Sequence, residues 1–299
     1  MNINLYTDAQ KSSRGLFMEL RDMKCPPWLP LYIGGRIPIM LKQLNFSMLN
    51  KTEVAIQRLK QHEPPEGYYL GFSGGKDSIV IYDIAVKAGV KFDAHYNVSP
   101  IDPPEIKKFI KDHYLDVAWD NHAKDFWKQF QSHGAPMRTN RWCCRLIKEV
   151  GGIGRVKVLG MRRSESIGRK RYSVYKKHER SESTYWLLPI VDWCDGEVWE
   201  YIDENKLVYC SLYDEGFHRL GCVLCPYESA QISQLMIERF PKIAKAWRIA
   251  FERYYQKRIE RGTPLSFINS EEYWQWWISR KGTNQNVNSP QLKLVYLNE

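Results

Sequence analysis

The sequence has no long apolar run, and no stretch of its 299 residues approaches the length of a membrane span. Its first residues, MNINLYTDAQKSSRGLF, lack the basic and then apolar order of a secretory signal, so a cytoplasmic location is the default expectation. No internal repeat is visible, and a hydrophobic fraction of 43% excludes a disordered or low-complexity chain. These absences leave a globular protein of one large domain or two modest ones.

Positive charge is in excess. Lysine and arginine number 44 against 34 aspartates and glutamates, which gives a formal net charge of +10. This balance favours contact with polyanions or with small anionic substrates. Because many nucleotide enzymes are basic without touching nucleic acid, charge alone leaves that choice open.

Strand and helix patterns alternate along the middle of the chain. Residues 68–72 predict a strand and residues 78–90 a helix, with Gly89 as its C-cap. Further strands are expected in KFDAHYNV, DVAWD, GRVKVLGM and YWLLPIVDW, with helices between them. This alternation predicts an α/β fold, a Rossmann-like parallel sheet with helices on both faces.

The pattern changes near residue 227, after which only helices are expected, with an interruption at Pro241. We therefore expect three parts: an N-terminal extension of unknown role (1–50), an α/β domain (51–226) and a helical C-terminal region (227–299). The last part interleaves basic residues with Trp247, Tyr254 and Tyr255. That suits a nucleic-acid surface or, more simply, a helical cap with core aromatics and solvated charges.

The most informative stretch is YYLGFSGGKDS, residues 68–78, where a buried strand runs into glycines, a cation and hydroxyls. Glycines let backbone N–H groups close on an anion, and the helix that follows adds its dipole. The loop is not a Walker A motif, because the first glycine of that motif would fall at Leu70 and Asp77 stands at the hydroxyl position. The stretch predicts a phosphate site of another kind.

The loop resembles the PP-loop of the adenine nucleotide alpha-hydrolase superfamily, which includes N-type ATP pyrophosphatases and the phosphoadenylyl-sulfate (PAPS) and adenylyl-sulfate (APS) reductases. The resemblance implies a HUP-type Rossmann-like domain whose loop cradles a terminal phosphate or pyrophosphate of ATP, APS or PAPS. It implies that Lys76 supplies charge and that backbone or hydroxyl donors come from Ser73, Gly74, Gly75, Asp77 and Ser78.

A second segment, GMRRSES at residues 160–166, resembles a Gly-x-Arg-Arg-x-x-Ser segment of PAPS reductases. Arginine suits a tetrahedral anion because its fork donates two parallel hydrogen bonds. The resemblance adds Gly160, Arg162, Arg163 and Ser166 to the nucleotide site. It also makes both arginines, together with Lys76 and Asp77, the catalytic candidates, and it extends over about residues 54–226.

Seven cysteines without an export signal point to metal binding or redox chemistry rather than to disulfides. The pairs Cys143-Cys144 and Cys222-x-x-Cys225 resemble the CC…CxxC pattern by which APS reductases and DNA-phosphorothioation relatives hold a [4Fe–4S] cluster. A four-cysteine zinc site is an alternative, although adjacent ligands are unusual for tetrahedral zinc. Thiols packed without metal are the third possibility.

One feature departs from the sulfonucleotide reductases, which attack sulfur with a cysteine near the C-terminus. Here no cysteine follows Cys225. The departure favours the other PP-loop chemistry, in which an acceptor oxygen attacks the α-phosphate of ATP and expels pyrophosphate, with Mg²⁺ on the leaving group. Asp77 is the candidate that orients this metal ion.

The resulting expectation is an iron–sulfur enzyme of sulfur metabolism that adenylates an acceptor for sulfur transfer. A nucleic acid acceptor and a sulfur or electron donor protein are the partners that this chemistry suggests. Two alternatives stay open. One is a thioredoxin-dependent PAPS or APS reductase that uses Cys25, Cys194 or Cys210, and the other is a nucleotide-binding accessory module without turnover.

Overall fold

The structure is a computed structural model that describes residues 50–123, 125–178 and 183–280. The N-terminal extension, including Cys25, and the last residues lie outside this part of the chain. Packing divides the chain into two compact units. Of the described residues, unit 1 holds those from Asn50 to Tyr96, in Glu105–Trp119 and in Gly152–Leu220, and unit 2 holds those in Asn97–Pro104, in Asp120–Gly151 and from Gly221 to Arg280.

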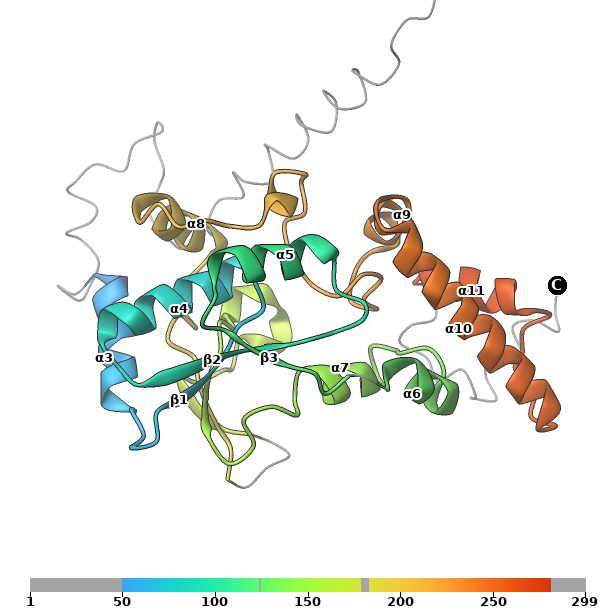
Figure 1. Ribbon diagram of the computed structural model, residues 1–299, viewed down its shortest axis with the longest axis horizontal. Helices are drawn as coiled ribbons and strands as arrows, with labels where there is room; N and C mark the ends of the chain where they lie inside the picture. Colours follow the sequence, from blue (N-terminus) through green and yellow to red (C-terminus); the bar gives the residue numbers. More distant parts are fainter. Residues whose placement is uncertain (1–49, 124, 179–182, 281–299) are drawn as a thin grey trace, which may run out of the picture. The chain divides into compact units, whose positions relative to one another are not determined.

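A six-stranded sheet is the framework of unit 1 (Figure 1). Its strands are β1 (Tyr68–Gly71), β2 (Phe92–Asn97), β3 (Ala118–Asp120), β4 (Val156–Val158), β5 (Tyr175–Lys177) and β6 (Tyr185–Leu187). They lie in the order β3-β2-β1-β4-β6-β5. Strand β1 pairs in parallel with β2 and β4, β4 pairs in parallel with β6, and β5 is an antiparallel edge strand. The mostly parallel sheet confirms the predicted Rossmann-like α/β fold.

Four helices accompany the sheet: α3 (Lys51–Gln61), α4 (Lys76–Ala88), α5 (Pro104–His113) and α8 (Asp195–Glu204). Helix α4 packs against both α3 and α8. It ends at Gly89, whose φ of 67° is the left-handed cap that the sequence predicted. Its first turn starts at Lys76, two residues before the predicted start, so Lys76 and Asp77 are helical residues at the end of the glycine loop.

The apolar run YWLLPIVDW is mostly not a strand. Strand β6 ends at Leu187, and the chain then turns, with the Val191 N–H donating to the Leu188 carbonyl over 3.2 Å. Leu188, Ile190 and Val191 are nevertheless completely buried. The run therefore supplies core side chains rather than extended backbone, which is why its length overestimated the strand. The same pattern did not predict β5, a polar three-residue edge strand.

Unit 2 is helical, with α6 (Phe126–His133), α7 (Trp142–Ile147), α9 (Ala230–Arg239), α10 (Pro241–Glu260) and α11 (Ser270–Ile278). Pro241 is at the first turn of α10, where its missing N–H costs nothing, and it separates α9 from α10 as predicted. Neither α10 nor any other described helix is long and apolar enough to cross a membrane.

Aromatic side chains form the core of unit 2. The Trp247 ring lies 5.8 Å from Phe130 of α6 and 5.0 Å from Trp277 of α11, measured between ring centroids. Trp247, Tyr254 and Tyr255 are each less than 10% exposed, at 1%, 8% and 8%. The aromatics of the basic C-terminal region are thus core residues, as the simpler of the two interpretations predicted.

The strand order reverses between β1 and β4, which makes the ends of these strands the topological switch point where open α/β sheets bind ligands. Gly160 follows β4 there and lies against the first turn of α4. A Cβ at Gly160 would stand 2.9 Å from the backbone carbon and oxygen of Asp77. The absence of a side chain at Gly160 therefore sets how closely α4 approaches β4.

We expect Gly160→Ala to destabilise the protein by about 1–3 kcal/mol, because backbone atoms must move to admit the methyl group. Gly168→Ala is the matched control, since a Cβ there would meet nothing within 4 Å. Urea unfolding of the two variants measures the difference, and equal stabilities would contradict the close approach.

Candidate functional site

The loop between β1 and α4 presents backbone donors at the switch point. Gly74 has a φ of 71°, a left-handed conformation that favours glycine, and it leads into the 13-residue helix α4. Within the described part of the chain, no acceptor takes the backbone N–H of Ser73, Gly74 or Asp77. Three donors and the positive end of a helix dipole form an anion site.

The two loop serines have different environments. Ser78 is buried, and its hydroxyl donates to the Gly75 carbonyl over 2.7 Å, which closes the loop onto the helix. Ser73 is exposed, and its hydroxyl accepts from the Gly75 N–H over 3.4 Å. Ser78 therefore shapes the loop, whereas Ser73 is accessible to a ligand.

Lys76 is buried, with 4% of its surface exposed. Its backbone N–H donates to the Tyr213 hydroxyl over 2.8 Å, and its ammonium donates to the His218 carbonyl over 3.2 Å. The same ammonium stands 3.9 Å from a carboxylate oxygen of Asp77 and 3.7 Å from one of Asp195. The lysine predicted to contact phosphate is thus held beside two carboxylates.

Arg162 links the same two carboxylates. Its Nε donates to Asp77 over 2.6 Å, one terminal nitrogen bonds Asp195, and the other donates to the Ser164 hydroxyl over 2.9 Å. Only 2% of the residue is exposed. Its guanidinium is occupied by protein groups, so in this structure Arg162 positions two acids, and contact with a phosphate stays a prediction.

The pKa values of the two acids are shifted in opposite directions. Burial raises the pKa of Asp77, although Lys76 and Arg162 act in the opposite direction. For Asp195, burial also acts to raise the pKa, but Lys76 and Arg162 outweigh it and the pKa is lowered. The side chain of Asp195 is 56% exposed. Asp195 is therefore an ionised, accessible carboxylate next to the loop.

Other predicted residues lie around this cluster. The Arg163 N–H donates to the Val191 carbonyl over 2.8 Å, and its Nε donates to the Tyr172 carbonyl over 2.7 Å. Its terminal nitrogens have no partner among the described residues. Ser166 is exposed at the start of the short 3₁₀ turn Ile167–Arg169.

Sequence reasoning missed three residues here: Asp195, Tyr213 and His218. Asp195 begins α8, the helix that follows β6, and β6 runs parallel to β4. An acid at that position was a usable signal, because the carboxyl ends of parallel strands share one edge. Tyr213 and His218 lie in a loop segment whose course the strand pattern does not predict.

All four predicted metal ligands belong to unit 2. Cys143 and Cys144 are in the first turn of α7, and the Cys225 N–H donates to the Cys222 carbonyl over 3.2 Å. The pKa of Cys143 is raised first by its hydrogen bond to Cys144 and by burial, and then by charges on Cys144, Cys222 and Cys225. The two pairs are therefore close enough to interact.

Nearby cationic side chains shift the pKa values of these thiols. The hydrogen bond from Cys143 lowers the pKa of Cys144, and Lys148 and Arg141 lower it further. Burial raises the pKa of Cys222, while Lys148 opposes that rise. In turn the pKa of Lys148 is raised, chiefly by Cys222. Among the thiols whose pKa is shifted, only Cys144 is moved toward the thiolate, the form that binds metal.

In the described ranges, no group of three or more histidine, cysteine, aspartate or glutamate side chains is arranged to hold a metal ion. A tetrahedral zinc ion and a [4Fe–4S] cluster both need four ligands around one centre, so this finding does not distinguish the two metals.

Comparison with known proteins agrees with the loop at the switch point. The model of the phosphoadenosine phosphosulfate reductase domain family matches residues 67–228, which contain the loop, both arginines and all four cysteines. The chain belongs to this family. The PAPS reductase family is part of the PP-loop adenine nucleotide alpha-hydrolase superfamily and includes enzymes, as the sequence predicted.

Individual relatives vary in how much of the chain they match. An uncharacterized protein of Methanocaldococcus jannaschii is 30% identical over 218 residues, which cover 69% of this chain and 50% of that protein. Adenosine 5′-phosphosulfate reductase of Staphylococcus haemolyticus is 27% identical over 169 residues, covering 51% of this chain and 68% of the reductase. The chain spans about half the length of the Methanocaldococcus jannaschii relatives that it matches.

Among solved structures, FMN adenylyltransferase of Candida glabrata in complex with ATP has 16% sequence identity and a TM-score of 0.45. The alignment covers 72% of this chain and 71% of the adenylyltransferase.

We expect Arg162→Met to cost about 3 kcal/mol of stability in this PAPS-reductase-family protein, because it leaves two partly buried carboxylates without their shared cation. Asp77→Asn introduced into the same variant should recover part of the loss, since it removes one of those charges. Urea unfolding measures both changes. Arg163→Met is the control and should stay within about 1 kcal/mol of the wild type. Equal losses for the two arginines would show that Arg162 does not hold the acids.

Proposed function

We propose that this protein is an iron–sulfur enzyme of sulfur metabolism that binds ATP at the PP-loop and cleaves it at the α-phosphate to support sulfur transfer. One observation carries the proposal. Three backbone N–H groups without an acceptor among the described residues, from Ser73, Gly74 and Asp77, lie at the switch point with the Lys76 ammonium and its neighbouring acids, Asp77 and Asp195.

Each group has a role in holding a triphosphate. The loop N–H groups donate to oxygens of the β- and γ-phosphates, the dipole of α4 favours their negative charge, and Lys76 adds positive charge. Ser73 is exposed and adds a hydroxyl donor. Because these donors are already in place, they stabilise the charge that builds up on the leaving pyrophosphate without reorganising.

The two acids fit a magnesium ion. Magnesium in nucleotide sites is bound through one or two carboxylates, with water and phosphate oxygens completing its shell. Asp77 and Asp195 would hold it, and when bound it supplies charge that neutralises the leaving pyrophosphate. Arg162 fixes both carboxylates by its bonds to them.

The reaction proposed here is an adenylation. An acceptor oxygen attacks the α-phosphorus, the bond from that phosphorus to the bridging oxygen breaks, and pyrophosphate leaves with the electron pair. A sulfur nucleophile then displaces AMP from the acceptor. The protein contributes position and charge, which can supply most of the rate enhancement of a phosphoryl or nucleotidyl transfer.

The cysteines fit a [4Fe–4S] cluster better than zinc. Cys143, Cys144, Cys222 and Cys225 provide the four-thiolate set of such clusters, and their charges interact. Adjacent ligands such as Cys143 and Cys144 are unusual for tetrahedral zinc. When bound, a cluster supplies electron-transfer chemistry.

Relatives named adenosine 5′-phosphosulfate reductase favour a second candidate, reduction of APS or PAPS. That reaction needs an accessible thiolate to attack sulfur. In unit 1, Cys210 is 1% exposed and burial raises its pKa, so it is a poor nucleophile. Cys25 lies outside the described residues, and Cys194, the third candidate, is half-buried at the N-cap of α8. ATP cleavage therefore remains the first candidate.

The nucleotide test uses protein purified without oxygen. We expect ATP with Mg²⁺ to raise the melting temperature more than APS or PAPS does, since a ligand that binds only the native state stabilises it. With a persulfide sulfur donor and RNA or DNA acceptors, ATP should release pyrophosphate. Sulfite release from APS or PAPS without pyrophosphate release from ATP would instead support the reductase.

Asp195→Asn should lower pyrophosphate release by roughly 10²-fold and remove the Mg²⁺ dependence of ATP binding, because it removes an anionic metal ligand. Asp192→Asn is the matched control, since Asp192 pairs with Arg58 over 2.7 Å instead of facing the loop. The two variants are compared by coupled pyrophosphate assay and by thermal unfolding with and without EDTA. Equal effects would reject the magnesium role.

For the cysteines, we expect anaerobically purified protein to be brown, with broad visible absorption and about four irons per chain. Cys225→Ser should lose the colour, whereas Cys210→Ser should keep it because Cys210 belongs to unit 1. Metal analysis accompanies the spectra. A colourless protein that carries one zinc ion would overturn the cluster assignment.

A further inference from the structure

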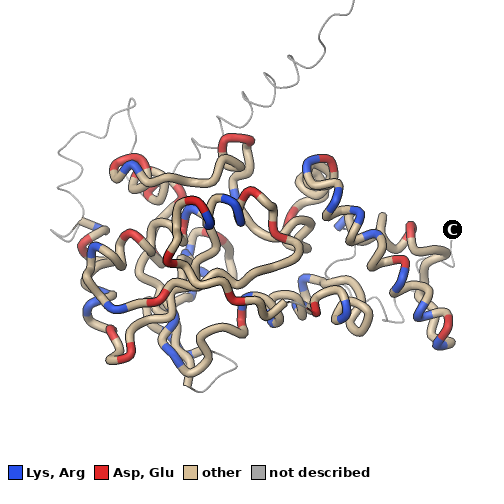
Figure 2. Tube along the Cα trace, viewed as in Figure 1, with Lys and Arg blue, Asp and Glu red and all other residues tan. Residues whose placement is uncertain are grey.

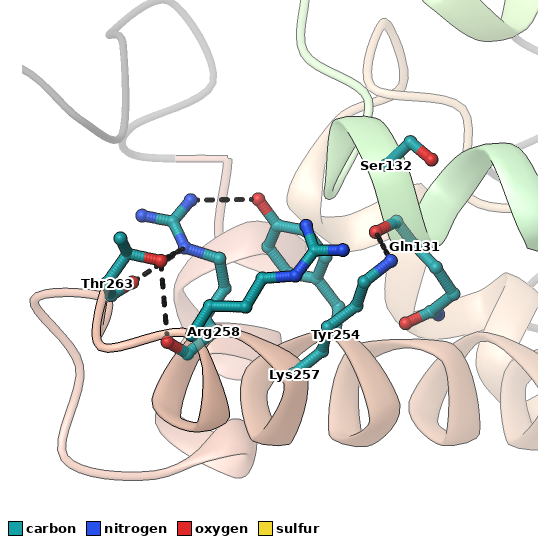
Figure 3. A pocket seen from close by; sticks show the side chains of 7 residues that line it. Gln131, Ser132, Tyr254, Lys257, Arg258 and Thr263 are labelled. Atoms are coloured by element: carbon teal, nitrogen blue, oxygen red, sulfur yellow. Dashed lines mark hydrogen bonds between the residues drawn. The ribbon is translucent and has the colours of Figure 1, made fainter.

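Unit 2 contains a cavity that shares no residue with either site described above. It has a volume of about 330 Å³ and lies beside the C-terminal part of α10 (Figure 3). Lys257, Arg258 and Arg261 line it, and no aspartate or glutamate does. The cavity therefore has a strong excess of positive charge.

None of the three cations forms an ion pair with an acid among the residues that the structure describes. The Lys257 ammonium donates to the Gln131 carbonyl over 2.8 Å, and Arg258 Nε donates to the Thr263 carbonyl over 2.6 Å. Arg261 is exposed, and its side chain has no partner in the described ranges. By contrast, Arg248 on the same helix pairs with Glu271 over 3.4 Å.

Three uncompensated cations repel one another, and a bound anion removes that cost. The donors suit a phosphate group, because arginine forks and hydroxyls match its tetrahedral oxygens. Arg258 is already oriented by Thr263 and by the Tyr254 hydroxyl, which its Nη1 reaches over 3.1 Å (Figure 3). Binding would therefore not have to order this side chain, which lowers its entropic cost.

The positive charge of the cavity continues along helix α10. Residues 241–261 contain seven lysines and arginines and two glutamates, and Figure 2 shows the basic residues spread along α10. Lys242, Lys245 and Arg253 are exposed on one face at helical spacing. A 20-residue helix is about 30 Å long, so a polymer with regularly spaced phosphates fits this surface better than one small anion does.

The positions of the aromatic side chains determine which part of such a polymer could be recognised. Trp247, Tyr254 and Tyr255 are buried in the core, so they are not available for stacking on bases. Recognition would rest on the phosphate backbone, which carries no sequence information.

We propose that this cavity binds a backbone phosphate of a nucleic-acid strand, with the exposed basic face of α10 following the strand. This surface would hold the acceptor strand of the proposed sulfur transfer. Only the role of the strand as acceptor rests on the proposed function. Binding itself does not depend on ATP cleavage, so the two proposals can fail separately.

The test measures fluorescence anisotropy of a labelled 20-nucleotide single strand, as DNA and as RNA, with the full chain at several salt concentrations. We expect binding of both strands, a steep loss of affinity with salt, and little dependence on base sequence. Arg261→Gln should weaken binding by roughly three- to tenfold and lower the slope of log K against log salt by about one, and Arg261→Glu should weaken it further.

Lys60→Gln is the matched control, because it removes one exposed charge from α3 in unit 1. Equal losses of strand affinity in Arg261→Gln and Lys60→Gln would show that the cavity is not the binding site and that binding is a general attraction to positive charge. No strand binding at low salt would reject the proposal outright. Arg261-dependent binding to vesicles containing phosphatidylserine, without strand binding, would assign the surface to a membrane instead. An Arg261-dependent rise in melting temperature with millimolar orthophosphate, without strand binding, would assign it to free phosphate.

Melting temperatures of both variants with ATP separate this result from the nucleotide site. An unchanged ATP shift together with weakened strand binding is the expected pattern.

Discussion

The buried guanidinium of Arg162 organises the ligand-binding edge of unit 1. It bonds one acid at the start of α4 and another at the start of α8, and so it joins the ends of β1, β4 and β6. Removing it would leave two like charges facing each other in a partly buried place. Beside these ion pairs, the backbone N–H groups of Ser73, Gly74 and Asp77 have no acceptor among the described residues. Gly160 makes the arrangement possible, since any side chain there would meet the backbone of Asp77.

In unit 2 the equivalent constraint is hydrophobic. The aromatic core joins α6 and α7 to α10 and α11, although about a hundred residues separate them in the chain. Trp142 belongs to that core, with its ring centroid 5.1 Å from that of Phe126, and Cys143 and Cys144 follow it directly. On the other side, the Arg280 side chain donates to the Leu224 carbonyl over 3.1 Å, within the Cys222–Cys225 segment. Burial of aromatics thus brings the two cysteine pairs into electrostatic range.

The fold class and the loop were predictable because their signals are local. Glycines before a helix, an apolar strand and the cap at Gly89 each depend on a few neighbouring residues. The polar strand β5 and the early start of α4 were not predictable, since sheet pairing and loop geometry decide them. The role of Arg162 was unpredictable for a similar reason. Its family motif suggests phosphate contact, but its hydrogen-bond partners lie 85 and 33 positions away in the chain.

Local residue order is enough to identify the strand-loop-helix unit, its family and the four cysteines, because short-range periodicity, glycine geometry and motif spacing carry that information. Tertiary structure decided which charges meet. It paired Lys76 and Arg162 with Asp77 and Asp195, placed the aromatics of α10 in a core, and left Lys257, Arg258 and Arg261 without acidic partners in the described chain. The physical reason is that electrostatic interactions depend on distance in space and on burial, and neither quantity is encoded by neighbouring residues alone.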